Sequence, residues 1–399
     1  MQGQILARTL LMSCLFGAAV APAFANHRTG DFSQPELIVT GDFNRDGSTD
    51  LAVNVSGFDN IAILIGNGQG DFTLERHIET DTLPRGLASG DLNSDGHLDL
   101  ASITEWGYNI RLHLGDGLGG FVPLKELNGD GEPTRVALRD MNNDGNLDLI
   151  ACGPAEGVIL IYFGDGNGGF SNSALELEDL MNDYSFAIGD LNHDGNLDLA
   201  VNTIRFATTT DDHVAIYLSD GAGGFVPGAE LPTNPRPAAI ALGDLNDDGN
   251  IDIIVGGAGP DNDTGLFLTT YLGNSSGNFT QKQLNTLGPG VIEGEMALGD
   301  FNEDGNVDVA FPITFSQSET RSTTVLIFLG DGSGNLSSGE PLTVGQEPHT
   351  AITTDFNGDG HADLAVTNRR DGTVSILLGN GQGGFSSHAV IPIAVLPEP

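Results

Sequence analysis

Hydrophobic and polar positions alternate over short stretches along most of the chain. In residues 83–127, short runs that read as β-strands cover 83–92, 98–104, 109–114 and 121–127, with Gly, Asp and Asn between them. Strands of this length, separated by turn residues at this spacing, predict one four-stranded antiparallel sheet. No part of the sequence has helical periodicity of useful length. The pattern therefore predicts an all-β protein.

The third strand of these predicted sheets is apolar almost without interruption. Residues 158–163 read VILIYF, residues 325–329 read VLIFL and residues 376–378 read ILL. A strand with one face in water would alternate, so these strands must be covered on both faces. Sheets packed radially, one against the next, provide this cover and protect most strand edges.

A nine-residue acidic pattern, D-x-N-x-D-G-x-x-D, occurs seven times, and successive copies begin 49, 49, 50, 54, 56 and 55 residues apart. Such a period is typical of repeat proteins in which each copy is one supersecondary unit. Seven units of four antiparallel strands predict a seven-bladed β-propeller. An α-solenoid would need helical periodicity, and a stacked β-helix would need much shorter repeats. The repeats begin at a first strand and end at a fourth, so they give no sign of an exchanged closing strand.

The repeat unit resembles a known family. The acidic loop is followed by a run such as Leu-Asp-Leu-Ala and later by a turn of the form Leu-Gly-Asp-Gly-x-Gly-Gly-Phe. These features, over residues 36–395, are similar to the FG-GAP/VCBS repeats of bacterial secreted proteins and of the propeller in integrin α subunits. The turn departs from the pattern at 273–278, which reads GNSSGN, and at Leu336, which replaces Phe. The resemblance implies a calcium-binding propeller with a protein or glycan ligand on the face opposite calcium.

Each acidic loop places oxygen atoms where a shortened EF-hand loop would have its ligands. Side chains at positions 1, 3 and 5 can converge, Gly at position 6 makes the turn, position 7 offers its carbonyl, and position 9 adds a carboxylate. Oxygen-only ligation favours calcium over zinc or copper. Three carboxylates would also repel one another without a cation. The alternative is a set of Asn- and Asp-rich turns that bind no metal.

The sequence therefore predicts up to seven calcium ions with a structural role. The expected ligands are Asp42, Asn44, Asp46, Ser48, Asp50, Asp91, Asn93, Asp95, His97, Asp99, Asp140, Asn142, Asp144, Asn146, Asp148, Asp190, Asn192, Asp194, Asn196, Asp198, Asp244, Asn246, Asp248, Asn250, Asp252, Asp300, Asn302, Asp304, Asn306, Asp308, Asp355, Asn357, Asp359, His361 and Asp363.

The formal net charge is −40, with 15 Lys and Arg against 55 Asp and Glu. This excess repels nucleic acid and anionic membranes, so we expect neither as a partner. Residues 1–25 read as a signal peptide, with an apolar stretch at 10–20 and Ala-Phe-Ala at 23–25. A lipoprotein signal ending at Cys14 is a weaker alternative. We therefore expect a secreted, periplasmic or cell-surface protein, with a lead-in at 26–35 and one seven-repeat propeller over 36–399.

Cys152 is the one cysteine after the predicted signal, so we expect no internal disulfide. We expect bound calcium to stabilise the fold in its place. No later stretch approaches the about 18 apolar residues that a membrane-spanning helix needs.

Enzyme-like motifs in the chain fail on their context. The glycine turns at 115–120, 164–169 and 379–384 match a dinucleotide fingerprint, but a strand follows where a helix is required. Residues 273–277 match a nucleophile elbow, yet they are another copy of the same turn. We therefore expect a binding or adhesion module without catalysis. Two alternatives stay open. A polysaccharide lyase or hydrolase would require acid, base and arginine in the central depression, and a structural protein would self-associate at the cell surface.

Units 4, 5 and 6 are longer than the others. From the last Asp of the acidic loop to the residue after the glycine turn there are 27, 27 and 28 residues, against 22 in units 1, 2, 3 and 7. The extra residues, 203–212, 257–265 and 312–323, lie on the face opposite the acidic loops, where insertions often mark a binding surface. Ordinary loop variation is the alternative. This face would carry side chains of the types that anchor ligands, namely Trp106, Tyr108, Arg205, Arg321, Arg369 and Arg370.

Overall fold

The computed structural model describes the greater part of the chain. The described residues are 34–80, 83–104, 109–129, 133–153, 158–171, 173–176, 185–204, 212–259, 265–288, 290, 292, 294–314 and 322–393. By compactness the chain divides into two units, Met1–Asp31 and Phe32–Pro399, and every described residue belongs to the second. Among the described residues, no helix is long and apolar enough to cross a membrane.

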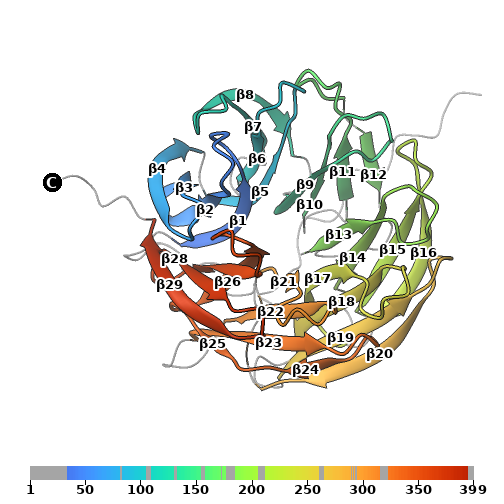
Figure 1. Cartoon of the computed structure of the whole chain (residues 1–399). Helices are drawn as coiled ribbons and strands as arrows, with labels where there is room; N and C mark the ends of the chain where they lie inside the picture. Colours follow the sequence, from blue (N-terminus) through green and yellow to red (C-terminus); the bar gives the residue numbers. More distant parts are fainter. Residues whose placement is uncertain are drawn as a thin grey trace, which may run out of the picture. The chain divides into compact units, whose positions relative to one another are not determined.

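Seven antiparallel sheets follow one another along the chain and form a ring of blades, as the sequence predicts (Figure 1). Blade 1 consists of β1 (Pro35–Gly41), β2 (Asp50–Val55), β3 (Asn60–Gly66) and β4 (Phe72–Glu79), with a short 3-10 turn, η1 (Ser56–Phe58). Blade 2 consists of β5 (Pro84–Gly90), β6 (Asp99–Thr104), β7 (Asn109–Gly115) and β8 (Phe121–Asn128). Blade 3 consists of β9 (Arg135–Arg139), β10 (Asp148–Cys152), β11 (Val158–Tyr162) and β12 (Ser173–Glu176).

The remaining blades repeat this plan. Blade 4 consists of β13 (Phe186–Gly189), β14 (Asp198–Thr203), β15 (His213–Ser219) and β16 (Phe225–Pro232). Blade 5 consists of β17 (Pro237–Gly243), β18 (Asp252–Ala258), β19 (Leu266–Gly273) and β20 (Phe279–Thr286). Blade 6 consists of β21 (Ala297–Gly299), β22 (Asp308–Ile313), β23 (Thr324–Gly330), β24 (Leu336–Ser338) and β25 (Leu342–Thr343). Blade 7 consists of β26 (Pro348–Thr354), β27 (Asp363–Asn368), β28 (Thr373–Gly379) and β29 (Phe385–Pro392).

The first strand of each blade lies nearest the centre of the ring, and the fourth lies at its periphery (Figure 1). Strands β2, β6, β14, β22 and β27 are buried along their whole length. The outer strands β4, β16 and β29 are mostly exposed or half-buried, with one buried position each. The two-sided burial of the middle strands agrees with their nearly continuous apolar sequence.

Seven clusters of buried hydrophobic residues lie between the blades, within the described part of the chain. Each cluster combines residues of two neighbouring blades, so the core is divided among the seven interfaces. The seventh cluster joins the last blade to the first: Ile38 and Val53 of blade 1 pack with Val374 and Ile376 of blade 7. Because apolar burial is the main favourable term in folding, closure of the ring rests on the same physical basis as the internal interfaces.

Among the described strands, none is exchanged to close the ring, because every sheet is made of consecutive strands. Side-chain and backbone bonds join blade 7 to blade 1 instead. The Thr367 hydroxyl donates to the Glu36 carbonyl oxygen at 2.9 Å, and the Gly70 backbone N–H donates to the Phe356 carbonyl at 3.0 Å.

Blade 6 has five strands in place of four because its outer strand is divided in two. Both β24 and β25 pair with β23, and the segment Gly339-Glu340-Pro341 separates them. Proline has no backbone N–H to donate to a sheet, and glycine in a strand often marks an irregularity, so these residues account for the interruption.

Candidate functional sites: the acidic loops and a charged cluster at the ring centre

Each acidic loop is a tight turn whose side-chain oxygens accept hydrogen bonds from its own backbone. In the first loop, Asp42 accepts from the N–H groups of Asp46 and Gly47, both at 3.0 Å, and Asn44 accepts from the N–H of Asp46 at 3.0 Å. The same bonds recur in the other six loops at 2.8–3.2 Å. The glycine at position 6 has φ between 82° and 88° in all seven loops, a left-handed conformation that glycine adopts without strain.

The aspartate at position 9 is fully buried in every loop, and each of its two oxygens accepts a backbone N–H. In blade 1, Asp50 accepts from Phe43 at the start of the loop and from Gly66 at the end of the third strand, both at 2.8 Å. This pair of bonds is present in all seven blades at 2.7–2.9 Å. The position-9 aspartate therefore fastens the acidic loop to the strand beside it. Sequence reasoning missed this role; the available signal was the place of this aspartate directly before an apolar run in all seven units.

Burial raises the pKa of the position-9 carboxyl groups, although the two backbone N–H donors oppose the shift. The pKa rises to about 6 for Asp50, Asp99, Asp252 and Asp308. The pKa is also raised for Asp148, Asp198 and Asp363. Burial thus makes ionisation of these groups less favourable than that of an exposed carboxyl group, and a nearby cation would oppose this effect.

The donor chemistry of the loops fits a hard cation. Carboxylate oxygens at positions 1, 5 and 9, an amide oxygen at position 3 and a backbone carbonyl at position 7 are the kinds of ligand that calcium takes. A carboxylate oxygen has two lone pairs, so the buried position-9 oxygens keep acceptor capacity beyond their N–H bonds. Within the described residues, however, no group of three or more His, Cys, Asp or Glu side chains is arranged to hold a metal ion. Calcium at these loops stays a prediction.

Neighbouring acidic loops contact one another around the ring. Asn143, at position 4 of the third loop, donates to the side-chain oxygen of Asn196, at position 7 of the fourth loop, at 2.9 Å. Glu303 and His361 form an ion pair between the equivalent positions of the sixth and seventh loops. In addition, the glycine turn of one blade donates an N–H to position 2 of the preceding loop, as Gly119 does to Phe43 at 2.9 Å. The loops therefore form a belt along one side of the ring.

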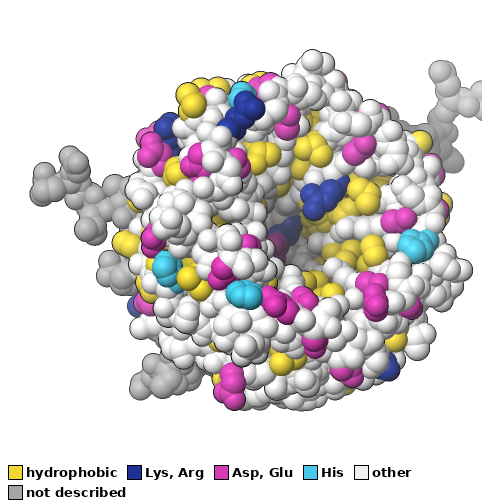
Figure 2. Space-filling model, in the orientation of Figure 1, with side chains coloured by type: hydrophobic (Ala, Val, Ile, Leu, Met, Phe, Trp, Pro, Cys, Tyr) yellow, Lys and Arg dark blue, Asp and Glu magenta, His cyan; other side chains and the backbone are white. Residues whose placement is uncertain are grey.

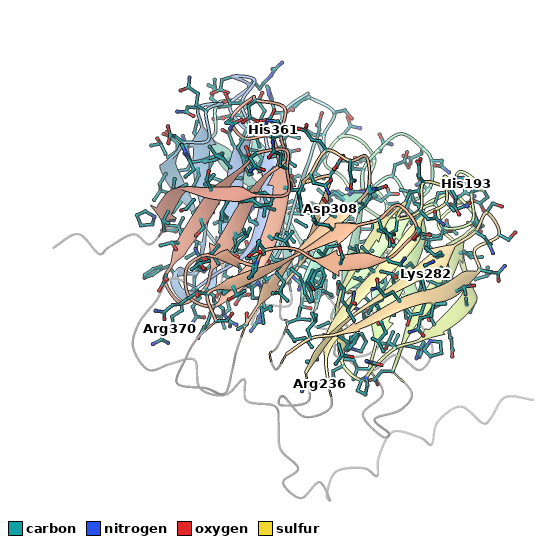
Figure 3. All side chains as sticks on the ribbon, turned by 60° about the horizontal axis from the view of Figure 1, so that its bottom comes forward. His193, Arg236, Lys282, Asp308, His361 and Arg370 are labelled. Atoms are coloured by element: carbon teal, nitrogen blue, oxygen red, sulfur yellow. The ribbon has the colours of Figure 1, made fainter. Side chains whose placement is uncertain are left out.

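The structure describes two of the six residues predicted for the ligand face. Trp106, Tyr108, Arg205 and Arg321 lie outside the described residues. Arg369 and Arg370 follow β27 at the end of the blade away from the acidic loops, and Figure 3 shows Arg370 and Arg236 on the side of the ring opposite His193 and His361.

Arg369 belongs to a group of charged residues at the ring centre, which we call the central cluster. Its Nη2 atom lies 3.4 Å from Oε1 of Glu36, and Nη1 of Arg85 lies 4.0 Å from the other oxygen of Glu36. The Glu36 side chain is only 5 % exposed. The cluster comprises Glu36, Arg85, Arg135, Glu295, His349 and Arg369.

One ion pair of the central cluster crosses the ring. Nη1 of Arg135, in blade 3, lies 3.5 Å from Oε1 of Glu295, which precedes the first strand of blade 6. Blades 3 and 6 are not neighbours, so this contact has to span the centre. A hollow is visible there in the space-filling view, with basic and acidic side chains inside it (Figure 2).

The central cluster keeps Glu36 charged and His349 neutral. Burial alone would raise the pKa of Glu36, but Arg369, Arg85 and the Ser56 hydroxyl hold it below the usual value. Burial lowers the pKa of His349 to about 3, and the arginines at 369, 135 and 85 act in the same direction against the opposing effect of Glu36. At neutral pH the buried imidazole therefore carries no charge beside three guanidinium groups.

The comparison with known families agrees with the repeat read from the sequence. The FG-GAP-like repeat matches residues 42–102, 91–151, 140–201, 206–255, 244–311 and 355–397, which together cover most of the chain. The chain belongs to the FG-GAP-like repeat family. The longest internal stretch without a match, 312–354, holds most of blade 6, where the outer strand is divided and Leu336 replaces the usual Phe. No curated protein sequence matches the chain.

Solved structures show the same fold at low sequence identity. A protein from Lactobacillus plantarum has a TM-score of 0.59 and 14 % identity, covering 90 % of this chain and 97 % of its own. BBS1N, crystallised with ARL6DN, has a TM-score of 0.57 and 12 % identity, covering 86 % and 92 %. A functionally unknown protein from Desulfotomaculum acetoxidans has a TM-score of 0.56 and 11 % identity, covering 84 % and 89 %. These likenesses concern the fold of the FG-GAP propeller alone.

Sequence reasoning missed five of the six central-cluster residues. They occupy the starts of inner strands or the residues just before them, and they differ from blade to blade: Glu36, Arg85, Arg135, Glu295 and His349. The available signal was the presence of charged or titratable residues at positions, five or six residues before the acidic loop, where other FG-GAP units of this chain have uncharged residues.

Proposed function

We propose that this FG-GAP protein is an exported, calcium-stabilised propeller that acts as a binding module for a protein or glycan ligand. The observation that carries the proposal is the central cluster, to which five of the seven blades contribute charged or titratable side chains. Buried ion pairs add little to stability compared with apolar residues of the same size. Their concentration at the ring centre is therefore better explained by recognition than by folding.

Calcium is proposed at the seven acidic loops, where it would offset the repulsion between carboxylates. If extracellular calcium is near 1 mM and each loop binds with a dissociation constant near 0.1 mM, one site adds roughly 1.4 kcal/mol to the free energy of unfolding. Seven independent sites would add on the order of 10 kcal/mol, which rivals the net stability of a typical domain. Export is supported by the signal-like pattern of residues 1–25.

The first experiment is a glycan and extracellular-protein binding screen in millimolar calcium and again in chelator, with thermal melts alongside. We expect capture of one ligand class in calcium and a large drop in melting temperature in chelator. Unchanged melts on chelation would refute the calcium part of the proposal. Absence of any ligand in calcium, with a well-folded protein, would refute the binding part.

One observation favours a second candidate, an enzyme acting on an acidic polysaccharide. The central cluster brings together a neutral imidazole on His349, an ionised carboxylate on Glu36 and three arginines, which is the combination that such an enzyme requires. In β-elimination, a base would remove the proton from the carbon beside the substrate carboxylate, the C–O bond on the next carbon would break, a carbon–carbon double bond would form, and the departing oxygen would take up a proton. Turnover of uronic-acid polymers, followed by ultraviolet absorbance of the unsaturated product, tests this candidate. The binding module predicts no turnover.

A further inference from the structure

The glycine turn between the third and fourth strands of every blade is held by one Asp or Asn side chain. Its Oδ1 atom accepts the backbone N–H groups of the residues two and four positions later, at 2.8–3.3 Å in all seven turns. The residue is Asp in four blades and Asn in three, namely Asp116, Asp165, Asp220, Asp331, Asn67, Asn274 and Asn380. Because the same bonds form with both types, Asp and Asn are interchangeable as the acceptor.

Asn67 and Asn380 are the two Asn residues of this set that a glycine follows. Residues 66–70 and 379–383 have the same sequence, GNGQG. Glycine has no Cβ, so its backbone nitrogen can approach Cγ of the Asn before it. Attack at Cγ places negative charge on Oδ1, and the two N–H groups already directed at Oδ1 would stabilise that charge, as the donors of an oxyanion hole do. The turn therefore favours attack on the side-chain amide.

The described residues contain other Asn–Gly pairs, at 128–129, 167–168 and 357–358, and the structure opposes the same reaction in each. The N–H of Gly168 donates to the carbonyl oxygen of Leu92 at 3.1 Å. The N–H of Gly358 donates to Oδ1 of Asp355 at 2.7 Å. Asn128 lies in β8, where pairing with β7 fixes its backbone. In these pairs the glycine nitrogen is engaged or the Asn backbone is held in a sheet.

The backbone N–H groups of Gly68 and Gly381, by contrast, donate no hydrogen bond within the described residues, and the Asn before each is exposed to water. The glycine nitrogen can thus bond to Cγ, while the amide nitrogen leaves with the displaced proton as ammonia. Water then opens the resulting cyclic imide and gives either Asp or isoaspartate, with no oxidation or reduction. In isoaspartate the backbone runs through the side chain and is longer by one carbon.

Both turns lie at a boundary of blade 7. The N–H of Gly70 donates to the Phe356 carbonyl at 3.0 Å, between blades 1 and 7. The N–H of Gly383 donates to the Phe301 carbonyl at 2.7 Å, between blades 7 and 6. An added backbone carbon in the turn would displace these donors and the oxygen that holds the turn. Isoaspartate should therefore weaken both boundaries, whereas Asp should not.

We propose that Asn67 and Asn380 are sites of spontaneous deamidation, and that isoaspartate formed there loosens both boundaries of blade 7 as the protein ages. The reactants are the side-chain amide, the next backbone nitrogen and water, so the reaction needs neither an enzyme nor a bound ligand. The inference goes beyond the proposed binding function and does not depend on it.

The test is incubation of the full-length protein in millimolar calcium at neutral pH, followed by peptide mapping with mass spectrometry and enzymatic labelling of isoaspartate. Asn67 and Asn380 should gain the mass difference between an amide and an acid first. Asn167 and Asn357 should convert roughly threefold to tenfold more slowly, because the glycine N–H must first leave an acceptor, and the net strength of one hydrogen bond corresponds to this factor. A free peptide containing GNGQG gives the rate without the turn.

Asn274 is the matched control within the chain, since its Oδ1 accepts two N–H groups in the same way but a serine follows it. It should remain an amide while the two GNGQG sites convert. The double variant Asn67→Asp/Asn380→Asp should have the initial melting temperature of the unaltered protein and keep it longer, because an ionised carboxylate is a poorer electrophile than an amide. The aged unaltered protein should melt about 2 °C lower or more, with faster hydrogen exchange at Gly70 and Gly383.

Equal conversion at Asn167 or Asn357 would overturn the proposal, as would intact Asn67 and Asn380 after the free peptide has reacted fully. A lower initial melting temperature of the double variant would show that Asp and Asn are not equivalent in the turn, which also overturns it. Unchanged hydrogen exchange at the two boundaries in protein that carries isoaspartate at both sites would refute the effect on blade 7.

Discussion

The aromatic ring of Phe72, in blade 1, packs edge-on against that of Phe356, in blade 7, with centroids 5.4 Å apart and planes at 81°. The same arrangement joins Phe43 to Phe121 between blades 1 and 2, and Phe301 to Phe385 between blades 6 and 7. In each pair, the residue at position 2 of one acidic loop meets the phenylalanine that follows the glycine turn of the next blade. The interface that closes the ring therefore repeats the internal ones in detail.

Phe356→Ala and Phe43→Ala should destabilise the protein to a similar extent. Each removes a nearly buried ring, 3 % and 2 % exposed, from an interface between blades. We expect a loss of about 3 kcal/mol in the free energy of unfolding for either variant. Denaturant unfolding at fixed calcium would measure it. A much smaller loss in Phe356→Ala would mean that blade 7 and blade 1 are held together by other contacts.

When calcium is removed by a chelator, substitutions at position 9 of the acidic loop should lower the free energy of unfolding much more than substitutions at position 5. Asp198→Asn replaces one carboxylate oxygen with an NH2 group facing a backbone donor, either the N–H of Ser219 at 2.8 Å or that of Leu191 at 2.9 Å. We expect a loss of about 3 kcal/mol without any metal. Asp194→Asn, at exposed position 5, should cost about 1 kcal/mol or less in chelator. Chelator melts of the two variants make the comparison, and equal losses would contradict the structural role of position 9.

The contribution of the buried, neutral His349 to stability should fall as the pH decreases from 6.5, opposite in sign to the contribution of the position-9 carboxyl groups, whose raised pKa favours the folded protein at lower pH. The pKa of His349 is lowered to about 3 in the folded protein, so the unfolded chain binds more protons than the folded chain between pH 6.5 and 3. The contribution is fully present above pH 6.5 and is lost as the pH falls, by roughly 2 kcal/mol between pH 6.5 and 5. His349→Gln should remove this contribution, so the difference in stability between the unaltered protein and the variant should change by roughly 2 kcal/mol between pH 6.5 and 5 at the same calcium concentration. Parallel profiles would show that His349 does not titrate in this way.

Gly294→Ala should disrupt the central cluster. A Cβ atom at this position would lie 1.6 Å from the carbonyl oxygen of His349, so the backbone of blade 6 or blade 7 would have to move. We expect a loss of about 3 kcal/mol or more, as for other severe overpacking. Gly288→Ala is the matched control, because a Cβ atom there meets nothing within 4 Å. Thermal melts compare the two, and similar melting temperatures would contradict the close contact.

The sequence predicted the fold because its signals repeat. The strands expected at 83–92, 98–104, 109–114 and 121–127 correspond to β5, β6, β7 and β8 within a few residues. The seven acidic loops were recognised from spacing, and the FG-GAP resemblance is confirmed. The divided outer strand of blade 6 was missed, because Pro341 lies in a stretch that otherwise reads as a strand.

The central cluster could not be predicted in the same way. Its residues come from five blades and differ in type from blade to blade, although five of the six lie five or six residues before an acidic loop. Arg135 and Glu295 are 160 residues apart (295 − 135) in the chain but 3.5 Å apart across the ring. Only the closed ring brings them together. Similarly, the spacing of Asp50 identified it as a loop residue, whereas its burial and its bond to Gly66 depend on how the third strand pairs with the second.

Every blade is one continuous stretch of chain. The chain termini could therefore lie between any two neighbouring blades, which gives seven equivalent orders of the blades along the chain. A circularly permuted chain, opened between β16 and β17 and with the ends of the propeller joined by a flexible linker, would keep all seven blade interfaces. The same modularity means that duplication of a single unit adds a blade without rearranging any sheet. Proteins of this architecture can therefore change the width of the central opening by unequal exchange of repeats, while the chemistry of each acidic loop is inherited intact.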